Sequence, residues 1–242
     1  MIKFLKKILP FTYKRSLKEQ LGVPSMHWSL KNLKLKGFNP LSAADIGAFE
    51  GEWSKDFLEV FPTAKILMIE PQRKKEVILK KLCSQYTNVS YFISLLSSSG
   101  NKKVIFEENE TASHININAP TNDDISSDNY TVTKTFDEVL EIVKFPYPQF
   151  LKLDVQGHEI EVLKGAENAL AIAEVCMLEV TLLSIDEGTP LALDVMKFMD
   201  EAGFQLYDIS QFMRRPFDKA LYQLDVLFVK KTATWVAEKR WN

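Results

Sequence analysis

The sequence predicts an α/β fold in which a mostly parallel, doubly wound sheet ends in an antiparallel C-terminal hairpin. Strand-like and helix-like patterns alternate from about residue 28 to residue 203, which is typical of β–α–β units. The last two strand-like segments, 204–210 and 224–230, have no helical pattern between them, so they are most simply antiparallel neighbours. A chain of 242 residues is long enough to bury a substantial core.

The first half of this pattern begins with a helix expected over residues 28–37, which Gly37 would end. An apolar strand at 41–46 precedes a helix over 53–61, and Pro62 stops that helix. A buried strand at 64–69, a helix over 72–84 and a strand at 89–96 follow. Ser99-Gly100-Asn101 resembles a hairpin turn between Leu96 and Val104. The polar segment 109–130 is long for a connection, which favours a functional or disordered loop.

The second half resumes with a helix over 135–143 and a strand at 149–155. A helical pattern over 158–172 is interrupted at Gly165. A strand at 174–183 and a helix over 191–202, which ends at Gly203, complete the alternation. We therefore expect an N-terminal basic and helical extension (1–36), one ligand-binding domain (37–231) and a short tail (232–242).

Composition and charge indicate which partners and which cellular compartment to expect. The net charge of −2 gives no bulk electrostatic reason to expect nucleic acid. Cys83 and Cys176 have no C-x-x-C spacing, which favours reduced thiols and a cytoplasmic protein. No apolar run approaches the ~20 residues of a spanning helix. Lysines alternate with apolar residues within 1–15, so this segment is suited to peripheral contact with an anionic membrane. The alternative is that it docks on a protein surface, either on its own domain or on a second subunit of a homo-oligomer.

The segment 45–51, Asp-Ile-Gly-Ala-Phe-Glu-Gly, joins the first strand to a helix. A glycine turn at this place lets a nucleotide-like ligand approach the backbone. Asp45 replaces the first glycine of the dinucleotide pattern, and Glu50 and Glu52 flank a helix start that would otherwise favour phosphate. The turn therefore suits a cationic ligand that carries adenosine without phosphate, a description that fits S-adenosylmethionine.

Acidic residues recur where the expected strands end. Asp45, Glu70 and Asp154 end the first, second and fourth strands, and Glu179 lies within the fifth. Ligands of open α/β sheets bind beyond the carboxyl ends of the strands, so these carboxyl groups should meet there. Glu70 follows Asp45 by about 25 residues, close to the ~20-residue interval of an acid that binds a ribose diol.

Several segments together resemble the FkbM-type methyltransferases. The glycine turn 45–51 followed by Ile69-Glu70-Pro71 is similar to the opening of that family, and the block 151–167 (LKLDVQGHEIEVLKGAE) to its most recognisable stretch. Residues 132–140, 178–180 and 224–229 also match, so the resemblance runs from about 28 to 230. It implies a Rossmann-like class I methyltransferase fold. Two positions depart from the family: Gln156, where many members have Glu, and Phe49, where Asn or His is common.

The resemblance implies S-adenosylmethionine-dependent O-methylation, commonly of a sugar hydroxyl in a polysaccharide, glycolipid or natural product. It places Asp45, Gly47, Ala48 and Gly51 at the methionine end of the cofactor, Glu70 at the ribose, and Ser94 and Leu95 beside the adenine. Asp154 is expected near the transferred methyl group, with His158 and Glu179 close by as further catalytic candidates. A general base here would contribute roughly 10²–10⁴-fold.

Other interpretations stay open at this stage. A divalent metal between Asp154 and Glu179 is conceivable but not favoured, because no third ligand is evident. His114 and Arg214 are candidates for contact with an acceptor, Arg214 with an anionic one, although both also suit solvated side chains. Two other classes of protein use this type of fold: an NAD-dependent oxidoreductase and a catalytically inactive binding or scaffold protein.

Overall fold

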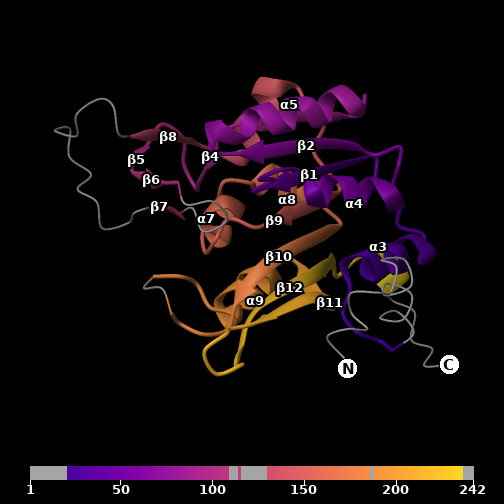
Figure 1. The fold of residues 1–242 in the computed structure, drawn as a ribbon. Coiled ribbons are helices and arrows are strands. Elements are labelled where there is room, and N and C mark those ends of the chain that lie inside the picture. Colours follow the sequence, from indigo (N-terminus) through magenta and orange to yellow (C-terminus); the bar gives the residue numbers. More distant parts are fainter. Residues whose placement is uncertain (1–20, 109–113, 116–129, 186–187, 237–242) are drawn as a thin grey trace, which may run out of the picture.

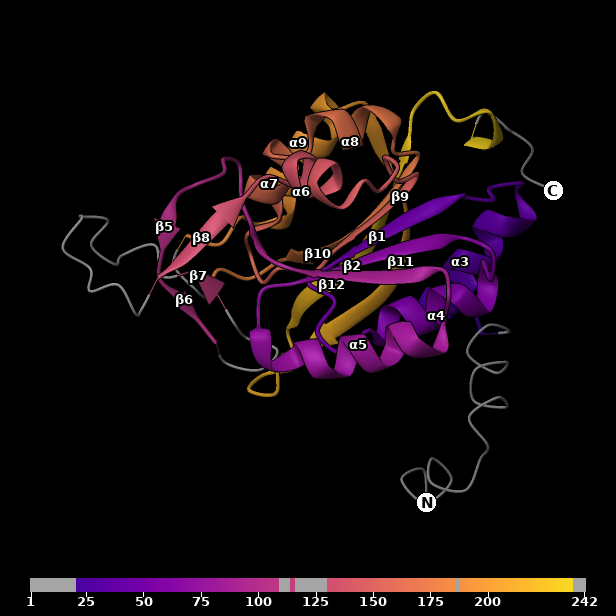
Figure 2. The ribbon, with the colours of Figure 1, turned by 90° about the horizontal axis from the view of Figure 1, so that it is seen from above.

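The computed structural model describes residues 21–108, 114–115, 130–185 and 188–236 of the chain. A seven-stranded sheet lies between two layers of helices (Figures 1 and 2). Its strand order is β11-β12-β10-β9-β1-β2-β3. This arrangement confirms the predicted fold class.

Five parallel strands form most of the sheet. They are β1 (Ser42–Ile46), β2 (Lys65–Glu70), β3 (Val89–Ile93), β9 (Phe150–Leu153) and β10 (Val175–Thr181). The predicted C-terminal hairpin is confirmed: β12 (Leu221–Lys230) is antiparallel to β10, and β11 (Phe204–Arg214) is antiparallel to β12. β1 is the middle one of the five parallel strands, and its Ala44 is in register with Leu67 of β2 and Leu151 of β9. The carboxyl ends of these strands therefore meet at one edge of the sheet.

Helices cover both faces of the sheet because each presents an apolar side to it. One layer contains α3 (Met26–Leu35), α4 (Glu52–Val60) and α5 (Glu76–Gln85), the last preceded by the 3₁₀ turn η1 (Arg73–Lys75). The other contains α6 (Phe136–Val143), α7 (Glu159–Lys164), α8 (Glu167–Ile172) and α9 (Ala192–Glu201). A second 3₁₀ turn, η3 (Thr234–Val236), follows β12.

Aromatic packing holds α4 against the sheet and so places the helix start that follows the glycine turn. The ring of Phe150 on β9 lies 5.0 Å from that of Phe57 and 5.5 Å from that of Trp53, both on α4. Each of these side chains is buried. Aromatic pairs at such separations add stability beyond the area they bury.

The expected interruption at Gly165 is confirmed and has a steric cause. α7 ends at Lys164 and α8 begins at Glu167. A Cβ atom at Gly165 would lie 2.3 Å from the carbonyl oxygen of Ser97. The glycine therefore lets the segment after β3 pass close to this helix end.

The expected hairpin between Leu96 and Val104 is wrong. β8 (Thr131–Lys134) lies between the two segments: it pairs in parallel with β4 (Leu95–Leu96) and antiparallel with β5 (Lys103–Val104). The hydroxyl of Thr133 donates to the carbonyl of Ser99, and the Asn101 N–H donates to the carbonyl of Thr133. These bonds to a distant segment occupy the backbone groups with which an isolated hairpin would have closed.

Two further short strands, β6 (Phe106–Glu107) and β7 (His114–Ile115), pair with each other. Figure 2 shows β5 to β8 gathered beyond one end of the large sheet. β11 is longer than expected, because it continues to Arg214 instead of ending at residue 210.

None of the helices within the described ranges is long and apolar enough to cross a membrane. The basic segment 1–15, expected to contact a membrane or a protein surface, lies outside the described residues. The division into 1–36, 37–231 and 232–242 stays a prediction. Leu30 and Leu33 of α3 are fully buried with side chains of α4 and of the central sheet.

Candidate functional site

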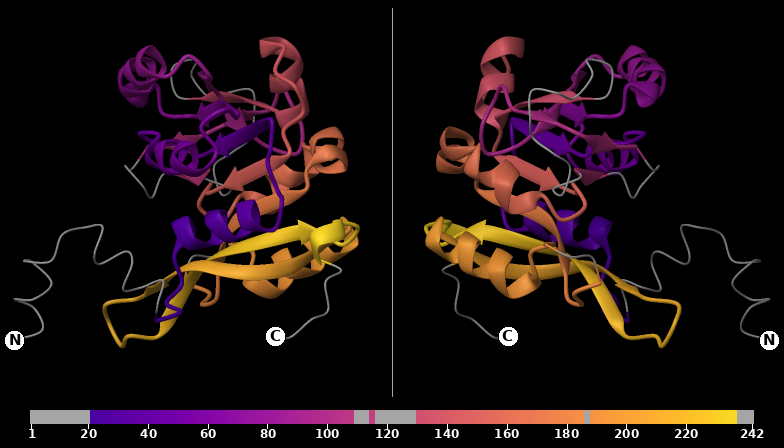
Figure 3. Two further views of the ribbon diagram at one scale, coloured as in Figure 1. Left: turned by 90° about the vertical axis from the view of Figure 1, so that its right-hand side faces the viewer. Right: turned by 90° about the vertical axis from the view of Figure 1, so that its left-hand side faces the viewer.

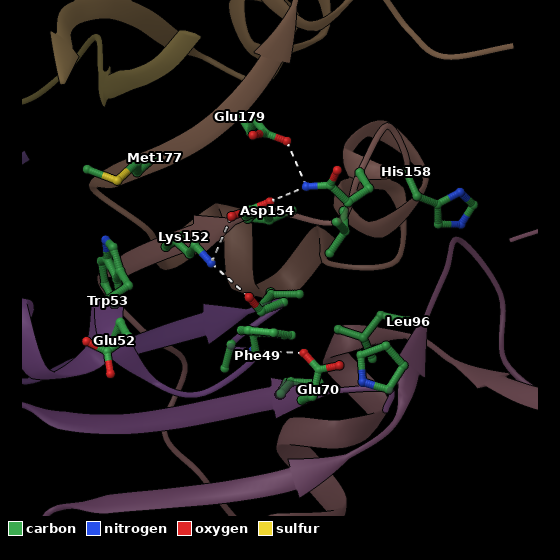
Figure 4. Close-up of a pocket in the computed structure, with 18 of the residues that line it drawn as sticks. Phe49, Glu52, Trp53, Glu70, Leu96, Lys152, Asp154, His158, Met177 and Glu179 are labelled. Carbon is green, nitrogen blue, oxygen red and sulfur yellow. Dashed lines mark hydrogen bonds and ion pairs between the residues drawn. The ribbon is translucent and has the colours of Figure 1, made fainter. Parts of the chain in front are cut away.

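A cavity of about 330 Å³ opens at the carboxyl ends of β1, β2, β9 and β10 (Figure 4). Its volume falls within the range of sites for small molecules. The residues predicted to form the site that line it are Gly47, Ala48, Glu70, Ser94, Leu95, Asp154, His158 and Glu179. Asp45 and Gly51 were predicted with them but do not line the cavity.

The turn after β1 is held closely between its two neighbouring strands. The N–H groups of Gly47 and Ala48 both donate to the carbonyl oxygen of Ile69 on β2. Gly47 has φ +75°, and a Cβ atom there would lie 1.9 Å from the carbonyl oxygen of Asp154. Gly51 faces another way, because its Cβ position would be 2.5 Å from Cδ2 of Leu82 on α5. Gly47 therefore allows a close approach of backbones at the cavity, and Gly51 allows close helix packing.

Asp45 acts behind the cavity wall. Its side chain is fully buried, and one carboxylate oxygen accepts a 2.8 Å hydrogen bond from the hydroxyl of Ser54. The other lies 3.1 Å from Nζ of Lys152, a residue that does line the cavity. Lys152 is not among the residues predicted from the sequence, although a lysine inside the apolar strand Phe150–Leu153 is a signal in itself.

Lys152 connects the glycine turn to the acids of the site. Its Nζ donates to the carbonyl oxygen of Gly47 at 2.9 Å and lies 3.7 Å from Oδ2 of Asp154. Burial alone would lower the pKa of this lysine, but Asp45 and Asp154 outweigh that effect and raise the pKa above its usual value. Lys152 is therefore charged at neutral pH.

Glu70, the last residue of β2, is oriented by two backbone donors. Its carboxylate accepts hydrogen bonds from the N–H of Phe49 at 2.8 Å and of Gln72 at 2.9 Å. Burial raises the pKa of Glu70, and these two bonds partly offset the increase. Phe49 thus contributes its backbone to the site, while its ring lies under Nζ of Lys75 at 3.6 Å.

A side-chain amide joins two of the predicted catalytic acids. Nε2 of Gln156 donates to Oδ1 of Asp154 at 2.8 Å and to Oε2 of Glu179 at 3.0 Å (Figure 4). Gln156 has φ +54°, and the carboxylate of Glu159 holds this loop by accepting from the N–H groups of Val155 and Gly157. The geometry fixes the amide between the two acids.

Three acids near this amide, Glu159, Glu179 and Asp225, have raised pKa values. Burial, together with the charges of Asp154 and Glu159, raises the pKa of Glu179 to about 9. Asp225 lies opposite Glu179 on β12, and burial with the charge of Asp154 raises its pKa to about 6. Burial also raises the pKa of Glu159 to about 7. The Asp154 side chain is 41% exposed, so this carboxyl is open to the cavity.

The other predicted residues lie farther from this centre. Nε2 of His158 lies 3.1 Å from the hydroxyl of Ser97, and the imidazole points away from Asp154 (Figure 4). Burial lowers the pKa of His158, so it is neutral at neutral pH. Arg214 is exposed at the end of β11 and does not line the cavity. His114 falls in β7, and its contact with an acceptor stays a prediction.

The cavity continues past Lys152 into a region that the sequence analysis did not anticipate. Trp53 of α4, Met177 of β10, Gln211 of β11 and Asp225 of β12 line this part. Asp225 interrupts the apolar run 224–229, which was the available signal. Within the described ranges, no group of three or more His, Cys, Asp or Glu side chains is arranged to hold a metal ion.

A protein-family model matches more than half of the chain. The family model described as the methyltransferase FkbM domain matches residues 45–206. A curated relative, hexuronic acid methyltransferase AglP of Haloferax volcanii, is 36% identical over 80 residues. That alignment covers 32% of this chain and 31% of the relative, so the chain spans about a third of its length.

Solved structures are also similar to this chain, at low sequence identity. The methyltransferase FkbM of Methylobacillus flagellatus KT is 16% identical with a TM-score of 0.47, covering 76% of this chain and 43% of that one. Fibrillarin of Aeropyrum pernix, solved with natively bound S-adenosyl-L-methionine, is 14% identical with a TM-score of 0.46. That match covers 82% of this chain and 74% of fibrillarin.

Proposed function

This chain belongs to the FkbM methyltransferase family, and from that membership we propose that it transfers a methyl group from S-adenosylmethionine to a hydroxyl of a carbohydrate. One observation carries the proposal: a single cavity is lined by Glu70 from β2, Asp154 from β9 and Glu179 from β10. The ribose acid and the catalytic acids expected from the sequence therefore face the same space.

The residues present fit this cofactor. S-adenosylmethionine carries a sulfonium and an ammonium group, and the cavity offers the carboxyl groups of Glu70 and Asp154 to these cations. Lys152, a buried cation on β9, lies beside Asp154. Glu70, held by two N–H groups, would accept hydrogen bonds from the ribose hydroxyls. Apolar side chains of Ile69, Leu95 and Leu96 would border the adenine. Glu50 and Glu52 also line the cavity and disfavour the pyrophosphate of NAD.

The cofactor, when bound, supplies an electrophilic methyl group. The chain must then hold an acceptor hydroxyl and remove its proton. Asp154 is the proposed base, because its side chain lines the cavity with 41% of its surface exposed and Gln156 fixes its orientation. Glu179, protonated at neutral pH, can donate a hydrogen bond to the acceptor. His158 remains a second candidate for the base, since it is neutral and lines the cavity.

The acceptor class and the compartment are also proposals. A sugar hydroxyl is supported by the family resemblance and by the relative named as a hexuronic acid methyltransferase. A cytoplasmic location is supported by the free thiols of Cys83 and Cys176.

The cofactor site is tested by calorimetric titration and by thermal unfolding with S-adenosylmethionine, S-adenosylhomocysteine and NAD. Ligand at 100 times its dissociation constant should add about 2.7 kcal/mol to the free energy of unfolding. The variant Glu70→Gln should bind S-adenosylmethionine at least about tenfold more weakly, because a charge-assisted bond is worth about 1.5–3 kcal/mol. Glu141→Gln, an exposed change on α6, is the matched control. Binding of NAD alone, or of none of the three, would refute the proposal.

The transfer step is tested with labelled S-adenosylmethionine and a panel of neutral glycosides and hexuronates. Asp154→Asn should lower kcat by roughly 10²–10⁴-fold, because the amide cannot accept the proton. Unchanged kcat in this variant would exclude Asp154 as the base. A wild-type protein that binds the cofactor but methylates no carbohydrate would limit the error to the acceptor class.

A further inference from the structure

The end of β11 and its connection to β12 carry exposed apolar side chains. We call residues 212–219 the hairpin tip. Phe212 and Met213 are 44% and 46% exposed, and Phe217, in the turn itself, is 90% exposed. Figure 3 shows this hairpin projecting away from the helices and the rest of the sheet. Phe217 therefore lies at the far end of a projecting turn.

Cations surround these apolar side chains. Arg215 forms two hydrogen bonds with Asp218, of 2.7 and 2.6 Å, which neutralises that acid. Arg214 and Lys219 donate instead to backbone carbonyls of the same turn, and no carboxylate among the described residues pairs with either. The guanidinium of Arg215 lies 5.6 Å from the Phe217 ring. The hairpin tip thus has an apolar end and an excess positive charge.

The hairpin tip also lies at the functional edge of the sheet. β12 is antiparallel to both β10 and β11, so β11 runs in the direction of the parallel strands and ends at their carboxyl edge. Gln211, which precedes Phe212, lines the cavity. Whatever contacts the hairpin tip is therefore held beside the cavity.

We propose that the hairpin tip docks on an anionic lipid surface. Isolated apolar side chains on a projecting turn can enter the headgroup region, where Arg and Lys contact the lipid phosphates. This positive charge complements an anionic leaflet, and it occurs in a chain whose net charge of −2 gives no general attraction. A consequence that rests on the proposed methyl transfer is that the acceptor hydroxyl belongs to a lipid-linked sugar.

The test is co-sedimentation of the full chain with phosphatidylcholine vesicles, with and without phosphatidylglycerol. The wild type should bind the anionic vesicles, and added salt should weaken binding. Phe217→Ser should lower the partition coefficient by about tenfold or more, because the lost aromatic burial is of that size. The double variant Arg214→Gln/Lys219→Gln should lower the partition coefficient by about fivefold for each charge removed, and its binding should depend less on salt. Val77→Ser, a change at another highly exposed apolar residue, on α5, is the control.

Three outcomes would overturn the docking proposal. They are an absence of wild-type binding, binding that Phe217→Ser leaves unchanged, and binding that Val77→Ser weakens equally. A hairpin variant that changes the oligomeric state without any vesicle binding would assign the surface to a second copy. Calorimetric titration with S-adenosylmethionine should be unchanged in the hairpin variants, so failure here is distinguishable from failure of the proposed function.

Discussion

Replacing Lys152 with methionine should destabilise the protein severely, and the contacts of this lysine set the magnitude. Its Nζ lies 3.1 Å from the fully buried carboxylate of Asp45 and donates to the carbonyl of Gly47 at 2.9 Å. After the substitution, Ser54 is the hydrogen-bond donor that remains to Asp45. Removing one partner of a buried ion pair costs about 3–5 kcal/mol, because the other charge is left uncompensated. We expect Lys152→Met to lower the free energy of unfolding by that amount.

A double-mutant cycle separates the pair from general damage to the core. Asp45→Asn alone should also be destabilising, because Lys152 then lacks its nearest acid. The double variant Asp45→Asn/Lys152→Met removes both charges, so its loss should be smaller than the sum of the single losses. Coupling energies of contacting residues fall at about 0.5–3 kcal/mol, and a buried pair should lie toward the upper end.

Urea unfolding followed by circular dichroism near pH 7 measures these differences. Lys80→Met, an exposed change on α5, is the control and should cost less than about 0.5 kcal/mol. The raised pKa of Lys152 means that the contribution of the pair is present below about pH 10.4 and is lost only as the pH rises through the higher folded-state pKa. A single-variant loss below about 1 kcal/mol, or additive losses in the cycle, would refute this account.

Three further predictions concern the same edge of the sheet. Because burial raises the pKa of Glu179 to about 9, the folded state keeps a proton that the unfolded chain loses above about pH 4.3, so stability should fall as the pH rises toward 9. Glu179→Gln should therefore gain stability over the wild type near pH 8 and not near pH 4, as thermal unfolding across pH would show; a pH-independent difference would contradict this. Gly47→Ala should lower the free energy of unfolding by several kcal/mol, because its Cβ would lie 1.9 Å from a carbonyl oxygen. The control is Gly37→Ala, with φ +98° and no atom within 4 Å of its Cβ; it should cost backbone strain alone, about 1 kcal/mol. Urea unfolding measures both losses. His158→Gln should retain kcat within about tenfold, and a loss beyond about 10²-fold would make this histidine the base.

Local signals predicted that the ends of β1 and β2 line the cavity, because this part of its geometry follows from where the strands end. A glycine turn after β1 and an acid ending β2 need only the order of strands and helices to face the same space. Gly47 and Glu70 line the cavity as expected. Asp45 belongs to the same motif but supports Lys152 from behind the wall. Sequence position alone does not tell whether such a residue lines the cavity or supports it from behind. The direction in which its side chain points depends on which side chain lies opposite in the neighbouring strand.

Long-range pairing explains what the sequence analysis missed. The turn at Ser99-Gly100-Asn101 has suitable residues for a hairpin, yet β8 from about 30 residues later forms the hydrogen bonds. Gln211 and Asp225 reach the cavity because the C-terminal hairpin adds two strands beside β10. Periodicity within a segment carries no information about either contact.

The parallel sheet brings acids to one edge, and the chain must keep their charges from repelling one another. Three features reduce this repulsion: Lys152 lies between Asp45 and Asp154, burial keeps Glu179 protonated, and Gln156 places an amide donor between Asp154 and Glu179. Many FkbM-type methyltransferases have a glutamate where this chain has Gln156, and a glutamate here would add a fourth carboxyl where the amide now donates. The amide therefore holds the Asp154 carboxyl in place where it is open to the cavity, which is the position that the proposed base for methyl transfer requires.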